Sequence, residues 1–117
     1  MVLSCETRGD LMILTVEKPR IDSQIAGVFR DEAEDYLSDN RVDCAVDLSN
    51  VRFMDSTGLS SLVSLLKFIG PDRKLELCGL TPQVTKALKL TRLDDIFVTR
   101  ANVREAELAR EARAAMS

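Results

Sequence analysis

The hydrophobic and polar positions of this 117-residue chain follow two different periods. Alternation with a period of two, or a short continuous apolar run, indicates a strand, whereas apolar residues three and four apart indicate an amphipathic helix. The segment 11–17 is apolar almost throughout, which predicts a central strand buried on both faces. The segment 41–49 alternates apolar residues with Asp43 and Asp47, which predicts a strand with one polar face. Shorter strands are predicted at 2–7, 74–80 and 96–99.

Two predicted helices lie in the middle of the chain. The first, from residue 23 to about 38, gathers its apolar residues on one face, and Asp22 or the serine after it can cap the first turn. The second, 58–69, is stopped by a Gly-Pro pair. Leu62 and Leu66 follow the spacing of its apolar face, so we expect both to be buried against the central strand. The segment 18–22 between strand and helix is expected to be a loop, because its proline cannot continue a sheet ladder.

The last third of the chain predicts two more helices. Thr81-Pro82 is typical of a helix start, because threonine caps the first turn and proline fits its first position. The segment 102–116 is rich in helix-forming residues, but its apolar face is thin. Strands separated by helices of this length form parallel pairs, while the hairpin at the start makes the sheet mixed. We therefore expect one α/β domain over residues 1–117, with a mixed sheet of four or five strands and about four helices mainly on one face.

Composition and charge exclude several classes of protein. The net charge of −3 and the pI near 5.0 argue against nucleic acid as a partner, since nucleic acid attracts basic surfaces. No apolar run reaches the roughly 18 residues of a membrane span, and the first residues do not resemble a signal peptide, so we expect a cytoplasmic protein without membrane insertion. The absence of histidine excludes a serine–histidine triad and most zinc sites. Cys5, Cys44 and Cys78 lie in apolar stretches and are expected to be buried free thiols.

The segment 53–62, Phe-Met-Asp-Ser-Thr-Gly-Leu-Ser-Ser-Leu, joins an apolar stretch to a helix through three polar residues. A carboxylate or hydroxyl here can accept hydrogen bonds from the free amides of the first helical turn, so Asp55 or Ser56 is interpreted first as a helix cap. The same amides and the helix dipole would also suit a phosphate group. The two interpretations are compatible, and in both Ser56 should be exposed at the start of the helix.

The segment 47–67, which contains Asp-Ser-Thr-Gly-Leu, resembles the signature of STAS domains, and in particular of bacterial anti-sigma factor antagonists. The segment 75–97 continues the resemblance, and Asp22 lies where the family carries an aspartate after its second strand. The resemblance implies that a partner anti-sigma factor, a serine kinase, phosphorylates Ser56, with Thr57 as the fallback acceptor. Only the unphosphorylated form would bind this kinase and free its sigma factor, and a serine phosphatase would reset the switch. The implied switch surface consists of Asp22, Asp55, Ser56, Thr57 and Gly58.

Other roles remain open at this point. Asp22 and Asp55 could together hold Mg²⁺, as in phosphate-receiving response regulators, but no suitably placed lysine accompanies them. A serine without a neighbouring base is a poor nucleophile, so we expect no enzymatic activity and no cofactor. STAS domains also serve as subunits of lipid or anion transporters and of stress-signalling assemblies, which would bind a partner without a phospho-switch. The sequence departs from the family where Lys18-Pro19-Arg20 and Arg92 replace frequent glycines.

Overall fold

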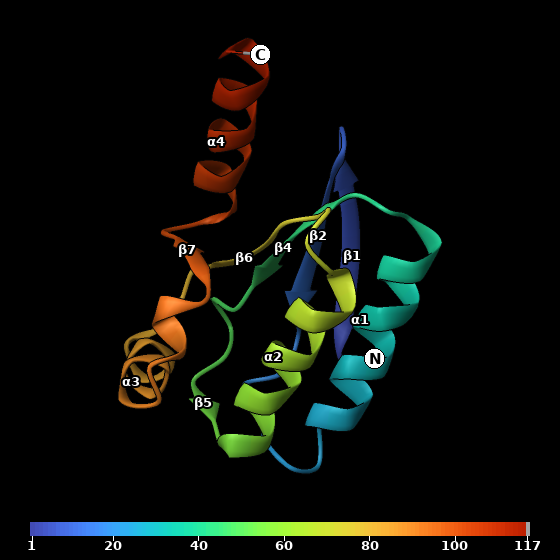
Figure 1. Cartoon of the computed structure of the whole chain (residues 1–117). Coiled ribbons are helices and arrows are strands. Elements are labelled where there is room, and N and C mark those ends of the chain that lie inside the picture. Colours follow the sequence, from blue (N-terminus) through green and yellow to red (C-terminus); the bar gives the residue numbers. More distant parts are fainter. Residues whose placement is uncertain (117) are drawn as a thin grey trace.

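A five-stranded mixed sheet organises the chain in the computed structural model, which describes residues 1–116 (Figure 1). The strand order is β1-β2-β4-β6-β7, with β1 antiparallel to β2 and the other neighbours parallel. This confirms the mixed α/β sheet expected from the sequence. The strands are β1 (Leu3–Arg8), β2 (Leu11–Val16), β4 (Asp43–Asp47), β6 (Leu75–Cys78) and β7 (Val98–Arg100).

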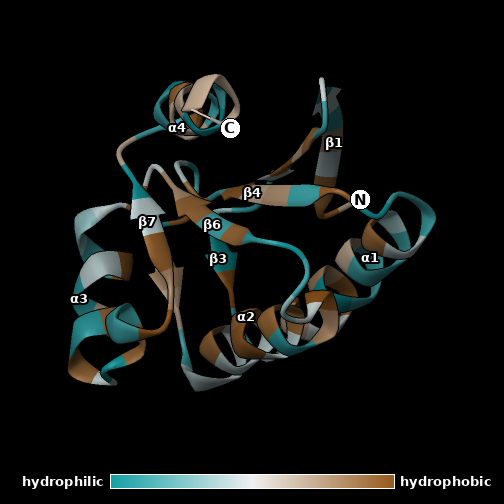
Figure 2. Ribbon diagram, turned by 45° about the horizontal axis from the view of Figure 1, so that its top comes forward, coloured by the Kyte–Doolittle hydropathy of each residue, from teal (hydrophilic) through white to brown (hydrophobic). Residues whose placement is uncertain are grey.

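The helices cover the two faces of the sheet unequally. Helices α1 (Ala26–Asp39) and α2 (Ser56–Ile69) lie side by side on one face, and α4 (Val103–Met116) lies on the other (Figure 2). Helix α3 (Pro82–Leu90) buries its apolar residues in the same core as α1 and α2. The helices are therefore mainly on one face, as expected. No helix within residues 1–116 has the length and apolar character needed to cross a membrane.

Strand β2 is buried on both faces, as its continuous apolar sequence predicted. Met12 and Leu14 face the core under α1 and α2, whereas Leu11 and Ile13 face α4. The neighbouring strand β4 keeps the predicted alternation, with its polar residues on the α4 side. Buried side chains of α1 and α2 fill the larger core; among them are Phe29, Ala33, Leu37, Leu59, Leu62 and Leu65.

Three details of the middle of the chain differ from the sequence-based expectations. The segment 18–22 is not entirely a loop, because Arg20–Ile21 form the short strand β3, which pairs in parallel with β5 (Phe53–Met54). Helix α1 begins at Ala26 rather than at residue 23, and no side chain caps it. The carboxylate of Asp22 instead closes a tight turn by accepting a hydrogen bond from the backbone N–H of Gln24 at 3.1 Å.

The predicted phase of α2 was also partly wrong. The helix begins at Ser56, two residues before the expected start at Gly58. Leu62 is fully buried as predicted, but the second core position is Leu65, and Leu66 is only half-buried. Both leucines fit a spacing of three or four from Leu62, so periodicity alone could not choose between them.

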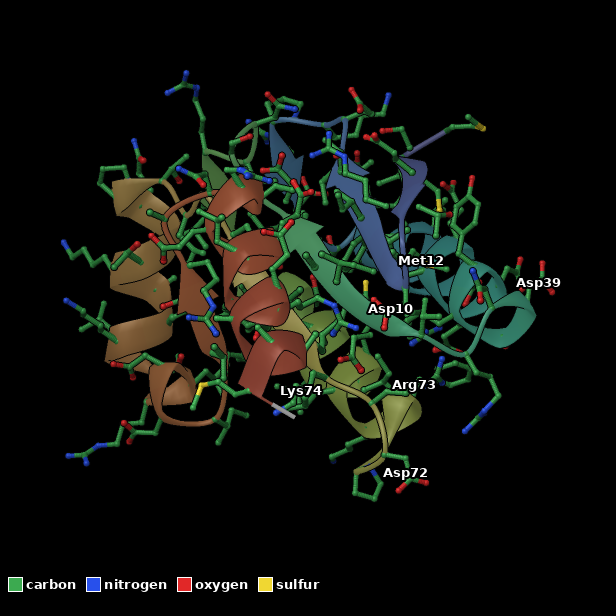
Figure 3. All side chains as sticks on the ribbon, turned by 90° about the horizontal axis from the view of Figure 1, so that it is seen from above. Asp10, Met12, Asp39, Asp72, Arg73 and Lys74 are labelled. Atoms are coloured by element: carbon green, nitrogen blue, oxygen red, sulfur yellow. The ribbon has the colours of Figure 1, made fainter. Side chains whose placement is uncertain are left out.

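A buried arginine joins the far ends of α1 and α2. Arg73 lies in the loop that follows α2 (Figure 3). It donates a hydrogen bond from Nη1 to the carbonyl of Leu37 at 2.8 Å and from Nε to the carbonyl of Ile69 at 3.4 Å. These carbonyls belong to the last turns of α1 and α2, where a cation also opposes the negative end of each helix dipole. Arg73 therefore fixes the two helices relative to each other at their C-terminal ends.

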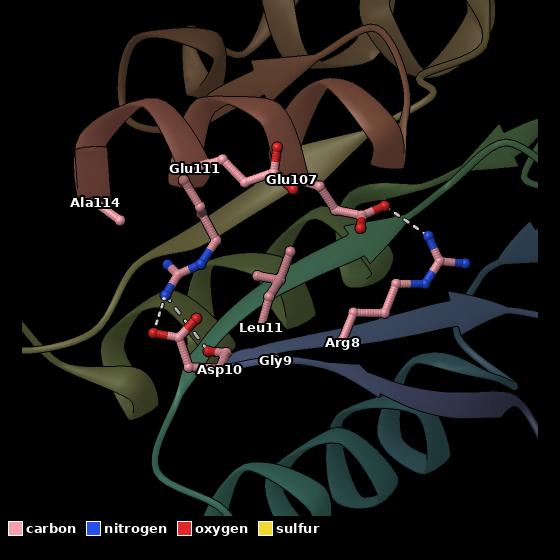
Figure 4. A pocket seen from close by; sticks show the side chains of 8 residues that line it. Arg8, Gly9, Asp10, Leu11, Glu107, Glu111 and Ala114 are labelled. Carbon is pink, nitrogen blue, oxygen red and sulfur yellow. Dashed lines mark hydrogen bonds and ion pairs between the residues drawn. The ribbon is translucent and has the colours of Figure 1, made fainter. Parts of the chain in front are cut away.

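Polar contacts hold α4 against the sheet. Ala106 is the one fully buried residue of this helix in the part that the structure describes, which agrees with its thin apolar face. Val103 adds a partly buried apolar contact, and ion pairs add further attachment: Arg8 reaches Glu107 at 2.6 Å, and Arg110 reaches Asp10 at 2.8 Å (Figure 4). Arg110 also contacts Asp43, which gives one aspartate on the polar face of β4 an ion-pair partner.

Candidate functional site

The pairing of β3 with β5 brings two loops together at one end of the molecule. In this parallel pair Ile21 lies opposite Met54, so the next residues, Asp22 and Asp55, emerge side by side. The backbone N–H of Ser23 donates a hydrogen bond to Oδ2 of Asp55 at 3.2 Å. The structure thus places the early aspartate loop and the Asp-Ser-Thr-Gly segment next to each other.

Asp55 is the N-terminal cap of α2. Its Oδ1 accepts hydrogen bonds from the backbone N–H groups of Thr57 and Gly58, both at 3.0 Å, and from the Thr57 hydroxyl at 2.5 Å. The Thr57 hydroxyl, followed by the Gly58 amide, holds the pKa of the Asp55 carboxyl below its usual value. Asp55 is therefore ionised and bonded to the N-terminal amides of α2. Of the two candidate caps, Asp55 and Ser56, the helix is capped by Asp55.

Ser56 is the first residue of α2 and is exposed, as predicted. Its hydroxyl makes no hydrogen bond to another group within the described residues 1–116. The hydroxyl of Thr57 is instead occupied by Asp55. Modification of the Ser56 hydroxyl breaks no hydrogen bond given for this site, whereas modification of the Thr57 hydroxyl removes its bond to Asp55.

Gly58 contributes to the site through backbone packing rather than through an exposed surface. It is buried in the first turn of α2, directly against β3. A Cβ atom at this position would lie 2.2 Å from the carbonyl oxygen of Ile21 and 2.6 Å from Cγ of Met54. Only glycine allows α2 to approach β3 this closely, and this approach sets the position of Ser56 relative to the Asp22 loop.

Arg20, which the sequence analysis noted only as a departure from the family, and Phe53, an apolar residue expected to be buried, are both exposed beside the Asp22 loop. Arg20 lies with its guanidinium 5.8 Å from the centre of the Phe53 ring, a cation–π distance, and its Nη1 is 3.7 Å from Oδ2 of Asp22. Phe53 is half exposed although it is large and apolar. The pattern of the sequence could not reveal this pair, because it depends on the register of β3 with β5.

A shallow hollow of about 320 Å³ separates the first turns of α1 and α2 beside Ser56. Its lining is made of small or hydroxyl-bearing residues, with Arg30 of α1 as the single charged side chain among the described residues that form it. The sequence analysis also missed Arg30, because it lies in an otherwise acidic stretch of α1. The lining residues are Ser23, Ala26, Gly27, Arg30, Ser56, Thr57, Ser60, Ser61 and Ser64.

The two aspartates do not form a vacant carboxylate pair. Asp55 directs one oxygen to the amides of α2 and the other to Ser23, and Asp22 accepts from the Gln24 amide. Within residues 1–116, no group of three or more cysteine, aspartate or glutamate side chains is arranged to hold a metal ion. This geometry does not favour the Mg²⁺ alternative.

Comparison with known proteins shows the family to which the chain belongs. The model of the STAS domain family matches residues 3–106, which cover the whole sheet and the helices α1, α2 and α3. The chain belongs to the STAS domain family. It is 36% identical over 90 residues to the anti-sigma-B factor antagonist of Staphylococcus aureus (strain NCTC 8325 / PS 47), an alignment that spans 76% of this chain and 74% of that protein.

Solved structures of other bacterial proteins share the fold. An anti-sigma factor antagonist from Mycobacterium paratuberculosis superimposes with a TM-score of 0.83 at 22% identity, covering 92% of this chain and 91% of the other. The phosphorylated form of the Bacillus cell fate determinant SpoIIAA superimposes with a TM-score of 0.64 at 14% identity, covering 94% of this chain and 98% of the other. At these identities the likeness shows the common fold.

Proposed function

We propose that this STAS protein is an anti-sigma factor antagonist with a phosphorylation switch at Ser56. Its unphosphorylated form binds an anti-sigma factor serine kinase and thereby releases the sigma factor, and a serine phosphatase restores that form after phosphorylation. The observation that carries the proposal is the free, exposed hydroxyl of Ser56 beside the capping carboxylate of Asp55. The similarity to proteins named anti-sigma-B factor antagonist supports it, and a cytoplasmic location follows from such partners.

The capping of α2 by Asp55 supports the modification that the proposal requires. In the phosphoryl transfer, Oγ of Ser56 bonds to the γ-phosphorus of ATP, the bond from that phosphorus to the leaving ADP breaks, and a base of the kinase takes the hydroxyl proton. Asp55 rather than Ser56 caps α2, so the helix keeps its cap after the transfer. The product carries about −1.5 to −2 added charge at the surface where the Asp22 and Asp55 loops meet.

The added charge provides the physical basis of the switch. A kinase that reaches the Ser56 hydroxyl must cover this end of the molecule and exclude water from it. Like charges brought together in a desolvated interface cost several kcal/mol. Because each ~1.4 kcal/mol is a tenfold change in affinity, phosphorylation should weaken binding roughly a hundredfold to a thousandfold.

The test is calorimetric titration of the purified anti-sigma factor kinase with three forms of the protein. We expect the wild type and Ser56→Ala to bind with similar affinity and Ser56→Asp to bind poorly while remaining folded, since a carboxylate is tolerated at a helix N-terminus. Thr57→Val serves as the neighbouring control and should still be phosphorylated on Ser56. Equal affinities of all three forms, or phosphate found on Thr57 alone, would overturn the proposed switch.

A co-purification experiment tests the partner separately from the switch. Recovery of a serine kinase of the anti-sigma factor type is the expected result. Recovery of a membrane transporter or of a large stress-signalling assembly, with no phosphate on Ser56 by intact mass, would overturn the antagonist role and favour the other STAS functions.

A further inference from the structure

Three amides in the first turn of α2, those of Thr57, Gly58 and Leu59, already donate hydrogen bonds to Asp55. The N–H groups of Thr57 and Gly58 donate to the Asp55 carboxylate, and the N–H of Leu59 donates to the Asp55 carbonyl at 3.0 Å. A helix N-terminus usually attracts a phosphate through these amides. Here these three are committed to Asp55, so the helix end offers a phosphate fewer donors than usual, and a nearby cation becomes its main partner.

Arg30 is the cation that lines the hollow beside Ser56. It lines the same hollow as Ser56, from the neighbouring helix α1. The N-terminal turns of α1 and α2 lie side by side, because the Ser23 amide bonds to Asp55 next to them. Arg73 joins the C-terminal turns of the same two helices. Side chains of a helix tilt toward its N-terminus, so the reach of Arg30 extends back toward the level of Ser56.

Lys67 also borders a hollow that contains Ser56, but it lies too far from Ser56 to reach a phosphate there. It belongs to the groove between α2 and the loop after α3. From residue 56 to residue 67 the helix rises roughly 16 Å, at about 1.5 Å per residue. This distance exceeds the reach of a lysine side chain and makes Lys67 a suitable control position.

Arg30 is free to change partners. Its side chain is 44% exposed, and its guanidinium lies 3.4 Å from a carboxylate oxygen of Asp31 and 3.7 Å from one of Glu34. Exposed ion pairs of this kind contribute little to stability. A phosphate offers up to two negative charges and three acceptor oxygens, to which a guanidinium can bind through two parallel hydrogen bonds. The phosphate is therefore the stronger partner for Arg30.

We infer that Arg30 binds the phosphate of phosphorylated Ser56 across the hollow between α1 and α2. The inference rests on the proposed function, since it takes the phosphorylation of Ser56 as given. In the phosphorylated form this ion pair connects α1 to α2, and the phosphate and the guanidinium lie in the hollow between them. It stabilises the switched-off state inside the protein itself, independently of any partner.

The experiment uses full-length protein with phosphoserine introduced at position 56 during translation, so that no kinase is required. The second pKa of the phosphate is measured by ³¹P NMR and compared with that of a phosphorylated peptide of residues 50–62, which should be about 6. In the wild type we expect this pKa to be lower by about half a unit to one unit, a roughly threefold to tenfold change in proton affinity. Arg30→Gln should raise it toward the peptide value, and Arg30→Lys should leave it between the two, because lysine lacks the planar fork.

Lys67→Gln is the matched control and should titrate as the wild type does. The Nε–H signal of Arg30 in ¹H–¹⁵N spectra should also shift on phosphorylation in the wild type and in Lys67→Gln. Identical titrations of the wild type and Arg30→Gln, or an unchanged Nε–H signal, would overturn the inference. The NMR measurement involves no partner protein. Failure to bind a kinase would therefore overturn the proposed function and not the Arg30 contact, and absence of the Arg30 contact would not overturn the proposed function.

Discussion

Oδ2 of Asp55 accepts a hydrogen bond from the backbone N–H of Ser23 at 3.2 Å, joining loops that are 32 residues apart in the chain. The other oxygen of the same carboxylate caps α2. One side chain thus fixes both the first turn of α2 and the loop that leads into α1. A partner or a modification that disturbs Asp55 should therefore affect both the Ser23 loop and the start of α2.

This coupling predicts a specific effect of Asp55→Ala on hydrogen exchange. Removal of the carboxylate should speed amide exchange at Thr57 and Gly58, which lose their acceptor, and also at Ser23 in the other loop. Asp22→Ala is the control: it should affect the Gln24 amide and leave Thr57 and Gly58 protected. Unchanged exchange at Ser23 in Asp55→Ala would show that the two loops are held together by β3 and β5 alone.

A pair of glycine-to-alanine variants tests the close approach of α2 to β3. At Gly58 the new methyl group would meet the Ile21 carbonyl oxygen at 2.2 Å, so we expect a loss of about 1–3 kcal/mol or more in the free energy of unfolding. At Gly27, a helical position of α1 with nothing within 4 Å, alanine should stabilise the protein by roughly 0.5–1 kcal/mol. Urea denaturation of both variants measures the difference. A Gly58→Ala protein as stable as Gly27→Ala would contradict the packing described for this helix.

The order of the elements could be predicted from the sequence because local patterns determine it. The continuous apolar run of β2 and the Thr81-Pro82 start of α3 carry their signals within a few residues. Arg92 was noted as a departure from a frequent glycine, and the structure gives the reason: its φ of 59° lies in the left-handed region that glycine adopts more readily. These features depend on the backbone preferences of single residues and short segments.

The features that the sequence did not predict depend on contacts between distant segments. Strand β3 has two residues and exists only because β5 lies beside it. Arg73 and Arg30 look like ordinary surface charges in the sequence, and their roles follow from the arrangement of α1 and α2. Asp22 looked like a cap for α1, but the turn that it closes delays the helix start to Ala26. The choice of Asp55 over Ser56 as the cap of α2 also required the three-dimensional geometry.

The corrected phase of α2 gives a third prediction. Leu65 is fully buried, so Leu65→Ala should lower the free energy of unfolding by about 2–5 kcal/mol. Leu66 is half-buried, and Leu66→Ala should cost clearly less, because fewer of its contacts are lost and solvent already reaches it. Chemical denaturation of both variants under identical conditions provides the comparison. If Leu66→Ala lowered the free energy of unfolding more than Leu65→Ala, the buried face of α2 would include Leu66, as the sequence suggested.

The cysteines give the fourth prediction, on their reactivity. All three thiols are free; Cys44 and Cys78 are buried as expected, but Cys5 is only half-buried. Cys44 faces the core under α1 and α2, whereas Cys78 faces α4, so these two thiols lie on opposite faces of the sheet. In native protein at neutral pH an alkylating reagent should therefore modify Cys5 first and the other two much later. Mass spectrometry of the time course would contradict this if Cys44 or Cys78 reacted as fast as Cys5.

Burial of the same thiols predicts a loss of stability at alkaline pH. Burial, assisted by the nearby Asp47, raises the pKa of the Cys78 thiol to about 12, and burial also raises that of Cys44. An unfolded cysteine titrates at about 8.5, so above that pH the unfolded chain binds fewer protons than the native protein, and stability falls as pH rises. The contribution of these buried thiols to the free energy of unfolding is fully present below pH ~8.5 and is lost progressively up to about 12.

We expect the urea midpoint to fall less between pH 7 and pH 10 in Cys78→Ala than in the wild type, because the variant lacks one of these thiols. Cys5→Ala, at the half-buried site, should follow the wild type more closely, and an equal fall in all three proteins would assign the alkaline loss to other groups.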